Sequence, residues 1–256
     1  MSEYSIAENF SQFFQIKFAN TKSLRQEAFK IRYGVYSDEL GWEPKNVLQM
    51  ETDECDDYAY HCLLEHKRTG VYAGCVRLVI PPVQTPALAL PFEKNCLHSV
   101  RKEILDSTKL TRGSFGEISR LAVLTSFRRR KKDKKGPFVL NAVNSDTIYT
   151  EEEHRHFPNI AMGLYIAAVA LADICNHIGS FVMMEPKLNR RLRRFGLPFD
   201  QIGDEIDYHG MRALFFLARD NFYSQLRPEL KELYQLIYND LVKQVFLLPH
   251  IDVMDR

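Results

Sequence analysis

The sequence lacks the features of a secreted, metal-binding or membrane-spanning chain. Its five cysteines are odd in number and include no C-x-x-C pair, so neither a disulfide framework nor a zinc knuckle is indicated. The first residues show no basic segment followed by a long apolar run, so no secretory signal is expected. The most apolar stretch, residues 160–172, is shorter than the roughly 20 residues that cross a bilayer. We therefore expect a cytoplasmic protein with reduced thiols and no bound metal.

An excess of charge of one sign is also missing, because 34 basic residues face 33 acidic ones. The charge is nevertheless uneven: residues 128–135 (RRRKKDKK) carry a net +6 and residues 187–194 a net +5. Two local basic patches on an otherwise acidic chain are not the pattern of a nucleic-acid binder. The first tract also has no aromatic side chain for base stacking, so no nucleic-acid partner is expected.

The hydrophobic periodicity predicts a mixed α/β chain. An amphipathic helix over residues 6–14 is expected to pack on the domain, with peripheral membrane contact as the alternative. Ser23, followed three residues later by Gln26, predicts a helix over residues 23–39. Further strands are predicted at 15–19, 58–65, 71–80, 115–124 and 181–184, and further helices at 163–177, 186–195 and 228–242. This order predicts a mixed sheet with helices on both faces, which is α/β or α+β.

No internal repeat and no Gly/Ser linker divides the 256 residues, of which 45% are hydrophobic. We expect one large domain over residues 23–220. A helical extension with a first strand (1–22) precedes it, and a C-terminal helix and tail (221–256) follow it. A polar, basic insertion at about 128–158 is long enough to carry a function.

Four separated blocks carry a resemblance to known proteins. They are R-Y-G-V-Y-x5-W at 32–42, E-x-D-x-x-D at 51–56, G-C-V-R-L at 74–78 and G-E-I-S-R-L-A-V at 116–123. In this order they resemble the acyl-homoserine-lactone autoinducer synthases, a branch of the GNAT acyltransferase fold. The resemblance implies a single GNAT-like domain whose mixed central sheet is splayed into a V.

Other segments resemble the N-acyl amino acid synthases and the acyltransferases of PEP-CTERM/exosortase systems. These segments are L-P-F-E at 90–93, F-R-R-R at 127–130 and Tyr208-His209-Gly210-x-Arg212. Residues 81–93 depart from the pattern of the autoinducer synthases. The resemblance thus implies transfer of a fatty acyl group to the amine of a small, amino-acid-like acceptor. An autoinducer synthase that uses S-adenosylmethionine is the alternative.

Glu117, Ser119 and Arg120 are the candidate catalytic residues. Acyl transfer from a thioester to an amine needs a base and a donor for the developing oxyanion. The two-residue period of a strand places Glu117 and Ser119 on one face and Arg120 on the other. The resemblance implies that Glu117 is the base, directly or through water, and that a backbone N–H beside a strand bulge polarises the thioester carbonyl. A structural carboxylate paired with Arg77 or Arg120 is the alternative.

Charged side chains near the first helix are the candidate acceptor-binding residues. Asp53 and Asp56 need partners, and a guanidinium matches a carboxylate in a two-point fork, so Arg32, Arg77 and Arg120 are expected to pair with them. The resemblance places these charges at the substrate cleft, where they bind the acceptor or organise the cleft. A solvated acidic loop is the alternative.

Aromatic and apolar side chains are candidates for the walls of the cleft. Trp42, the only tryptophan, and Tyr36 are predicted to form an aromatic wall for the acceptor, with a role as core anchors as the alternative. The strand at 181–184, with Met183 and Met184, is a candidate lining for an acyl chain, and core packing is its alternative.

The donor is expected to be an acyl-phosphopantetheine thioester carried by acyl carrier protein rather than by coenzyme A, with no tightly bound cofactor. In the GNAT fold the donor phosphate lies after the fourth strand, at a helix N-terminus. This position holds Phe127, Arg128, Arg129, Arg130 and Lys131 instead of a short glycine-rich loop. Such a segment fits the docking of a large acidic carrier protein. A solvated basic loop, or a non-enzymatic module that binds nucleic acid or anionic membrane, is the alternative.

Overall fold

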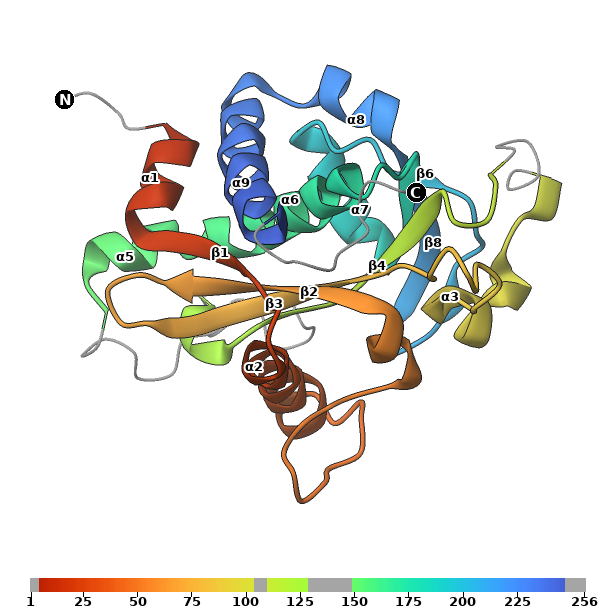
Figure 1. Ribbon diagram of the computed structural model, residues 1–256, viewed down its shortest axis with the longest axis horizontal. Helices are drawn as coiled ribbons and strands as arrows, with labels where there is room; N and C mark the ends of the chain where they lie inside the picture. The colour runs from red at the N-terminus through yellow and green to blue at the C-terminus, as the bar shows by residue number, and fades with distance from the viewer. Residues whose placement is uncertain (1–4, 104–109, 129–148, 247–256) are drawn as a thin grey trace.

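The computed structural model describes residues 5–103, 110–128 and 149–246, which form one eight-stranded sheet with helices on both faces (Figure 1). The strands are β1 (Phe14–Phe18), β2 (Ala59–His66), β3 (Val71–Val79), β4 (Phe115–Val123), β5 (Gly179–Met184), β6 (Asp200–Gln201), β7 (Ile206–Asp207) and β8 (Met211–Ala218). The α-helices are α1 (Ile6–Phe13), α2 (Lys22–Arg32), α3 (Pro91–Asn95), α5 (Glu151–His156), α6 (Pro158–Ile174), α7 (Pro186–Arg194), α8 (Arg219–Gln225) and α9 (Pro228–Phe246). Short 3₁₀ turns are η2 (Glu54–Tyr58), η3 (Leu97–Ser99) and η4 (Thr125–Phe127).

The sheet is mixed, with the strand order β1-β2-β3-β4-β5-β8-β6 and β7 beside β8. Every neighbouring pair is antiparallel except β4 and β5, which are parallel. The predicted class, a mixed sheet flanked by helices, is therefore confirmed.

The apolar helix α6 forms the centre of the larger layer. This helix lies between the sheet and α9, so apolar side chains occur around most of its circumference. Helix α1 packs against α9 on the same face of the sheet (Figure 1). Phe10 of α1 is buried there, as expected for packing on the domain. Helix α2 covers the opposite face of β2, β3 and β4. The domain boundaries proposed above stay a prediction.

The first long helix begins and ends differently from the prediction. Thr21, not Ser23, is the N-cap, and its hydroxyl accepts a hydrogen bond from the backbone N–H of Leu24 at 3.2 Å. The α-helical part ends at Arg32, and the chain continues as a π-helix, η1 (Tyr33–Glu39). The wider turns of η1 carry Tyr36 toward β4.

Strand β1 lies at one edge of the sheet, and a side chain of the last helix covers its free side. Gln244 of α9 accepts a hydrogen bond from the N–H of Phe18 at 2.8 Å and donates one to the carbonyl of Ile16 at 3.0 Å. Its amide therefore pairs with the edge as a peptide group of another strand would.

The parallel strands β4 and β5 pair over only four residues of each strand. Their register runs from Phe115 opposite Gly179 to Ile118 opposite Val182. Beyond this point the two strands no longer pair with each other, and each continues beside its other neighbour, β3 or β8. The predicted V-shaped splay is present at this fork.

Strand β4 also carries a bulge beside the fork. Ser119 pairs with Arg77 and Ala122 with Cys75, so two residues of β4, Arg120 and Leu121, face a single residue of β3. Arg120 has a φ of 49°, an uncommon value for a residue with a side chain. The bulge changes which side chains of β4 share a face.

Candidate active site

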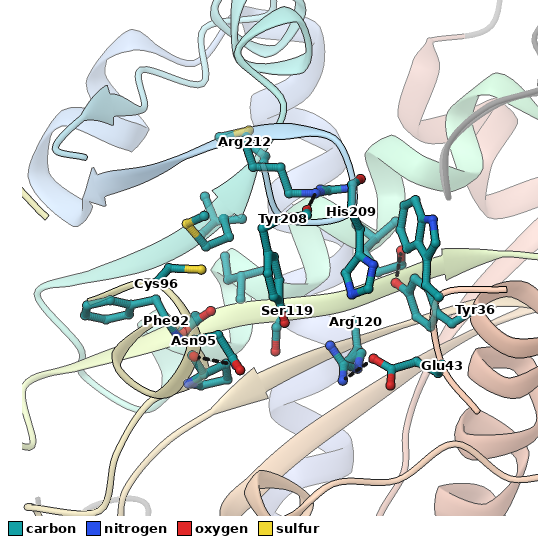
Figure 2. Close-up of a pocket in the computed structure, with 18 of the residues that line it drawn as sticks. Tyr36, Glu43, Phe92, Asn95, Cys96, Ser119, Arg120, Tyr208, His209 and Arg212 are labelled. Atoms are coloured by element: carbon teal, nitrogen blue, oxygen red, sulfur yellow. Dashed lines mark hydrogen bonds and ion pairs between the residues drawn. The ribbon is translucent and has the colours of Figure 1, made fainter. Parts of the chain in front are cut away.

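A pocket that is partly open to solvent lies at the fork between β4 and β5. Five consecutive residues of β4, from Glu117 to Leu121, form its floor. Its apolar lining includes Phe92, Tyr165, Val182, Met183 and Met184. Figure 2 shows Tyr208, His209 and Arg212 on the side opposite Ser119 and Arg120. The pocket thus combines an apolar interior with a few polar groups, as small-molecule sites do.

Glu117 is the buried carboxyl group of this pocket, with 2% of its surface exposed. Its Oε2 accepts a hydrogen bond from the backbone N–H of Phe92, in the first turn of α3, at 2.8 Å. In the described part of the chain no basic side chain lies within 4 Å of this carboxyl, so the alternative of an ion pair with Arg77 or Arg120 does not apply. Burial raises the pKa of Glu117 to about 8, against the opposing effect of the Phe92 hydrogen bond. Such a group can exchange a proton with a reacting amine near neutral pH.

The bulge turns Arg120 to the side of Ser119, so the prediction that Arg120 faces away from it is wrong. Arg77 donates from Nε to the Ser119 hydroxyl at 3.0 Å and from Nη1 to Asp53 at 2.6 Å. Arg120 contacts the same Asp53 at 3.2 Å and Glu43 at 3.2 Å. Side chains alternate between the two faces of the sheet only in a regular strand, and the extra residue of the bulge in β4 interrupts this alternation.

The predicted arginine–aspartate pairing is confirmed by the structure. Arg32 donates two hydrogen bonds to Asp56, at 2.7 and 3.0 Å, and Arg77 donates one to the same carboxylate at 2.8 Å. Burial by itself raises the pKa of Asp56, but these two guanidinium groups lower it well below its usual range.

The structure places these charged side chains outside the lining of the pocket, and their predicted role in binding the acceptor stays a prediction. Arg32, Arg77 and Asp56 are buried behind the bulge, and Asp53 lies at the edge of their cluster. The described lining of the pocket includes none of the four. Most of their donors and acceptors are used on one another, although Nη2 of Arg77 has no hydrogen-bond partner among the described residues.

Tyr36 and Trp42 do line the pocket. The Tyr36 hydroxyl donates a hydrogen bond to the bulge carbonyl of Leu121 at 2.8 Å. The rings of Tyr36 and Trp42 stack at 6.0 Å, and Trp42 stacks on His209 at 5.0 Å. Three nearly parallel rings therefore form one wall of the pocket.

The structure describes two of the five residues predicted to receive the carrier of the acyl donor, and both are buried. Phe127 is fully buried against Tyr149 and Phe157, and Arg128, 1% exposed, forms an ion pair with Glu39. The prediction that these two side chains receive a carrier is therefore wrong, because packing and pairing occupy them. The remaining residues of that prediction, Arg129, Arg130 and Lys131, lie outside the described residues.

Several pocket residues had no predicted role. They are Glu43, Asn95, Cys96, Tyr165, Tyr208, His209 and Arg212. The Tyr208-His209-Gly210-x-Arg212 segment was part of the resemblance, but nothing in the sequence placed it opposite β4. A second, more open groove adjoins the pocket through Trp42 and His209. Its charged lining comprises Lys187 and Arg190 of α7 together with Glu39, Glu185 and Glu205.

The chain is similar to several known acyltransferases. Residues 31–134, which contain all four blocks, match the acetyltransferase (GNAT) domain family. An acyl-homoserine-lactone synthase of Vibrio anguillarum is 26% identical over 178 residues, which cover 69% of this chain and 75% of that protein.

Two solved structures share the fold. An N-acyl amino acid synthase from uncultured soil microbes, FeeM, superposes with a TM-score of 0.53 at 14% identity, over 83% of this chain and 94% of that one. A CoA-dependent acyl-homoserine lactone synthase, BjaI, solved with SAM and isopentyl-CoA, superposes with a TM-score of 0.53 at 14% identity, over 88% of this chain and 98% of that one.

The fold is therefore GNAT-like, and the domain match and the relatives together indicate an N-acyltransferase. This result favours the enzyme over the non-enzymatic binding module. Within the described ranges, no helix combines the length and the apolar character needed to cross a membrane.

Proposed function

We propose that the protein transfers a fatty acyl group from the thioester of acyl carrier protein to the amine of an amino-acid-like acceptor, forming an amide. The observation that carries this proposal is a buried carboxyl group, Glu117, in a largely apolar pocket at the fork of β4 and β5. An apolar pocket suits an acyl chain, and a carboxyl group with a pKa near 8 suits proton exchange with an amine.

The reaction proceeds by direct attack in a ternary complex, without an acyl-enzyme. Glu117, as carboxylate, removes a proton from the acceptor ammonium, directly or through water, and the free amine attacks the thioester carbonyl. A backbone N–H of the bulge at Arg120 and Leu121 stabilises the oxyanion. The C–S bond then breaks, the nitrogen gives up its second proton as the amide forms, and the sulfur takes up that proton and leaves as a thiol. Arg120 and Ser119 hold the floor of the cleft in place.

The donor approaches through the groove beside α7. Lys187 and Arg190 are exposed there, and the phosphate of a phosphopantetheine arm is their natural partner. Helix α7 exposes three further arginines, Arg191, Arg193 and Arg194, which favour an acidic carrier protein over free coenzyme A. The acyl chain then extends past Met183 and Met184.

The curated relative favours a second candidate, an acyl-homoserine-lactone synthase that uses S-adenosylmethionine. The finer resemblance of the L-P-F-E segment and the Tyr208–Arg212 turn supports the first candidate, in a PEP-CTERM/exosortase system. Mass spectrometry of lipids from cells that express the protein separates the two candidates, because one yields an N-acyl amino acid and the other a lactone.

The test compares wild type with Glu117→Gln, and the control is Glu232→Gln, an exposed carboxylate of α9. New N-acyl species should appear with wild type and control and be absent with Glu117→Gln. Equal amounts from all three proteins would refute the role of Glu117. A lactone that disappears without S-adenosylmethionine would establish the second candidate.

The donor is tested separately with the purified enzyme. The double variant Lys187→Glu/Arg190→Glu should raise KM for acyl carrier protein at least tenfold, with a much smaller effect on the acyl-pantetheine thioester, which has no phosphate or protein. Equal effects on both donors would argue against docking at α7.

A further inference from the structure

Arg212 is a buried cation for which the described structure provides no anion. Only 7% of its surface is exposed, and no carboxylate of the described residues lies within 4 Å of its guanidinium. Its hydrogen bonds go to two backbone carbonyls of the preceding turn, from Nε to Tyr208 at 2.8 Å and from Nη2 to His209 at 3.4 Å. Burying a charge without a counter-ion is costly, so this position calls for an anionic ligand group.

The other buried arginines show how unusual this is. Arg32 and Arg77 each contact two carboxylates, and Arg128 contacts Glu39. Arg120, on the pocket floor, contacts three carboxylates. Among these arginines, Arg212 alone lines the pocket without a carboxylate of the described chain.

The surroundings of Arg212 hold the guanidinium in one place. Its Cζ lies 5.2 Å from the centroid of the Trp42 ring, which itself stacks on His209. The two carbonyl contacts use only part of the five N–H groups of a guanidinium. Figure 2 shows Arg212 above the pocket, across from Ser119 and Arg120 on the floor. The remaining donors are therefore available to a ligand that lies between this turn and β4.

We propose that Arg212 binds the carboxylate of the acceptor, so that the substrate class is a free amino acid rather than a simple amine or an amino acid ester. The inference rests on the proposed acyl transfer. With its carboxylate on Arg212, an acceptor would lie along the wall of Tyr36, Trp42 and His209 and present its nitrogen to Glu117. The donor phosphate is the other anion of the reaction, but its basic partners line the neighbouring groove, whose described lining does not include Arg212.

Binding of product-like probes tests the inference without requiring turnover. Trp42, the only tryptophan of the chain, lies against Arg212, so its fluorescence reports binding at this position. The probes are N-dodecanoylglycine and N-dodecanoylglycinamide, which differ only in the carboxylate. Wild type should bind the acid about 10- to 100-fold more tightly, which is the range for one charge-assisted contact.

Two variants and one control assign this preference to Arg212. Arg212→Gln should bind both probes with the affinity of wild type for the amide. Arg212→Lys keeps the positive charge but cannot donate two parallel hydrogen bonds, so it should prefer the acid over the amide only a few-fold. This variant replaces Arg212→Gln in the test if the glutamine variant does not fold. Arg25→Gln, an exposed arginine of α2 outside the pocket and the groove, should keep the full preference.

Each other outcome overturns the inference. Equal binding of the two probes by wild type, or an undiminished preference in Arg212→Gln or Arg212→Lys, would show that Arg212 does not bind the carboxylate. If Arg212→Gln instead loses affinity for 4'-phosphopantetheine alone, the residue belongs to the donor site. If wild type binds neither probe, the pocket takes no acyl chain, and the proposed function fails with the inference.

Discussion

Replacing Glu117 by glutamine should remove activity and stabilise the protein at alkaline pH. The folded-state pKa of Glu117 is about 8, above its ordinary 4.5. Between these two values the unfolded chain releases this proton while the folded chain keeps it, so stability falls as pH rises through this window. Above pH 8 Glu117 is ionised in folded wild type, and burial of its charge lowers the free energy of unfolding. Glutamine is neutral, so the variant does not lose this stability.

The size of the effect follows from the same two pKa values. A rise of the pKa from 4.5 to about 8 lowers the free energy of unfolding of wild type by at most about 5 kcal/mol at pH 9. At pH 5 the same shift changes it only slightly. For a chain of this length, each kcal/mol changes Tm by about 2–4 °C. Glutamine can still accept the hydrogen bond from the N–H of Phe92, so the substitution leaves α3 in place.

Thermal melts at pH 5 and pH 9, together with acyl-transfer rates, check this prediction. The variant should melt several degrees above wild type at pH 9, melt close to it at pH 5, and lose about 10²- to 10⁴-fold in rate. The wild-type rate should rise about tenfold from pH 7 to pH 9 as Glu117 loses its proton. A difference in Tm that is the same at both pH values would refute the raised pKa.

Three further predictions concern the cluster behind the site, a turn and the acyl lining. Asp56→Asn should cost about 3–5 kcal/mol in urea unfolding, because two buried arginines lose a shared carboxylate, whereas the exposed neighbour Asp57→Asn should cost little. Gly196→Ala should lose more than about 2 kcal/mol, because its φ is +84° and a Cβ would lie 2.2 Å from a backbone oxygen; Gly210→Ala, at φ +94° with no atom within 4 Å, should lose less. Met183→Trp should shift the products toward shorter acyl chains in mass spectra, and an unchanged chain-length distribution would show that the acyl chain does not pass this residue.

The strands were predictable where the signal was local. Runs rich in strand-forming residues located β2, β3 and β4 to within one or two residues, and α6 and α2 cover the two faces of these strands. The placement of Glu117, Ser119, Tyr36 and Trp42 at one cleft followed from the family resemblance, and the pocket contains all four.

The remaining site depends on contacts that are distant in sequence. A bulge adds one residue to β4 without a pattern in the hydrophobicity, so alternation gave the wrong face for Arg120. Arg212 follows Glu117 by more than 90 residues, and only the pairing of β5 with β4 and β8 brings the two to one pocket. A basic tract in the sequence did not reveal that Phe127 and Arg128 at its start are buried.

The amide of Gln244 on the edge of β1 has a consequence for biosynthesis. The side chain and the strand that it covers are separated by 226 residues, so the ribosome makes the strand long before its cover exists. During translation β1 can pair with β2, but its outer side stays open to strands of other nascent chains. Shielding against aggregation is thus one of the last steps of folding, and truncation within α9 should reduce the yield of soluble protein before it affects the chemistry at Glu117.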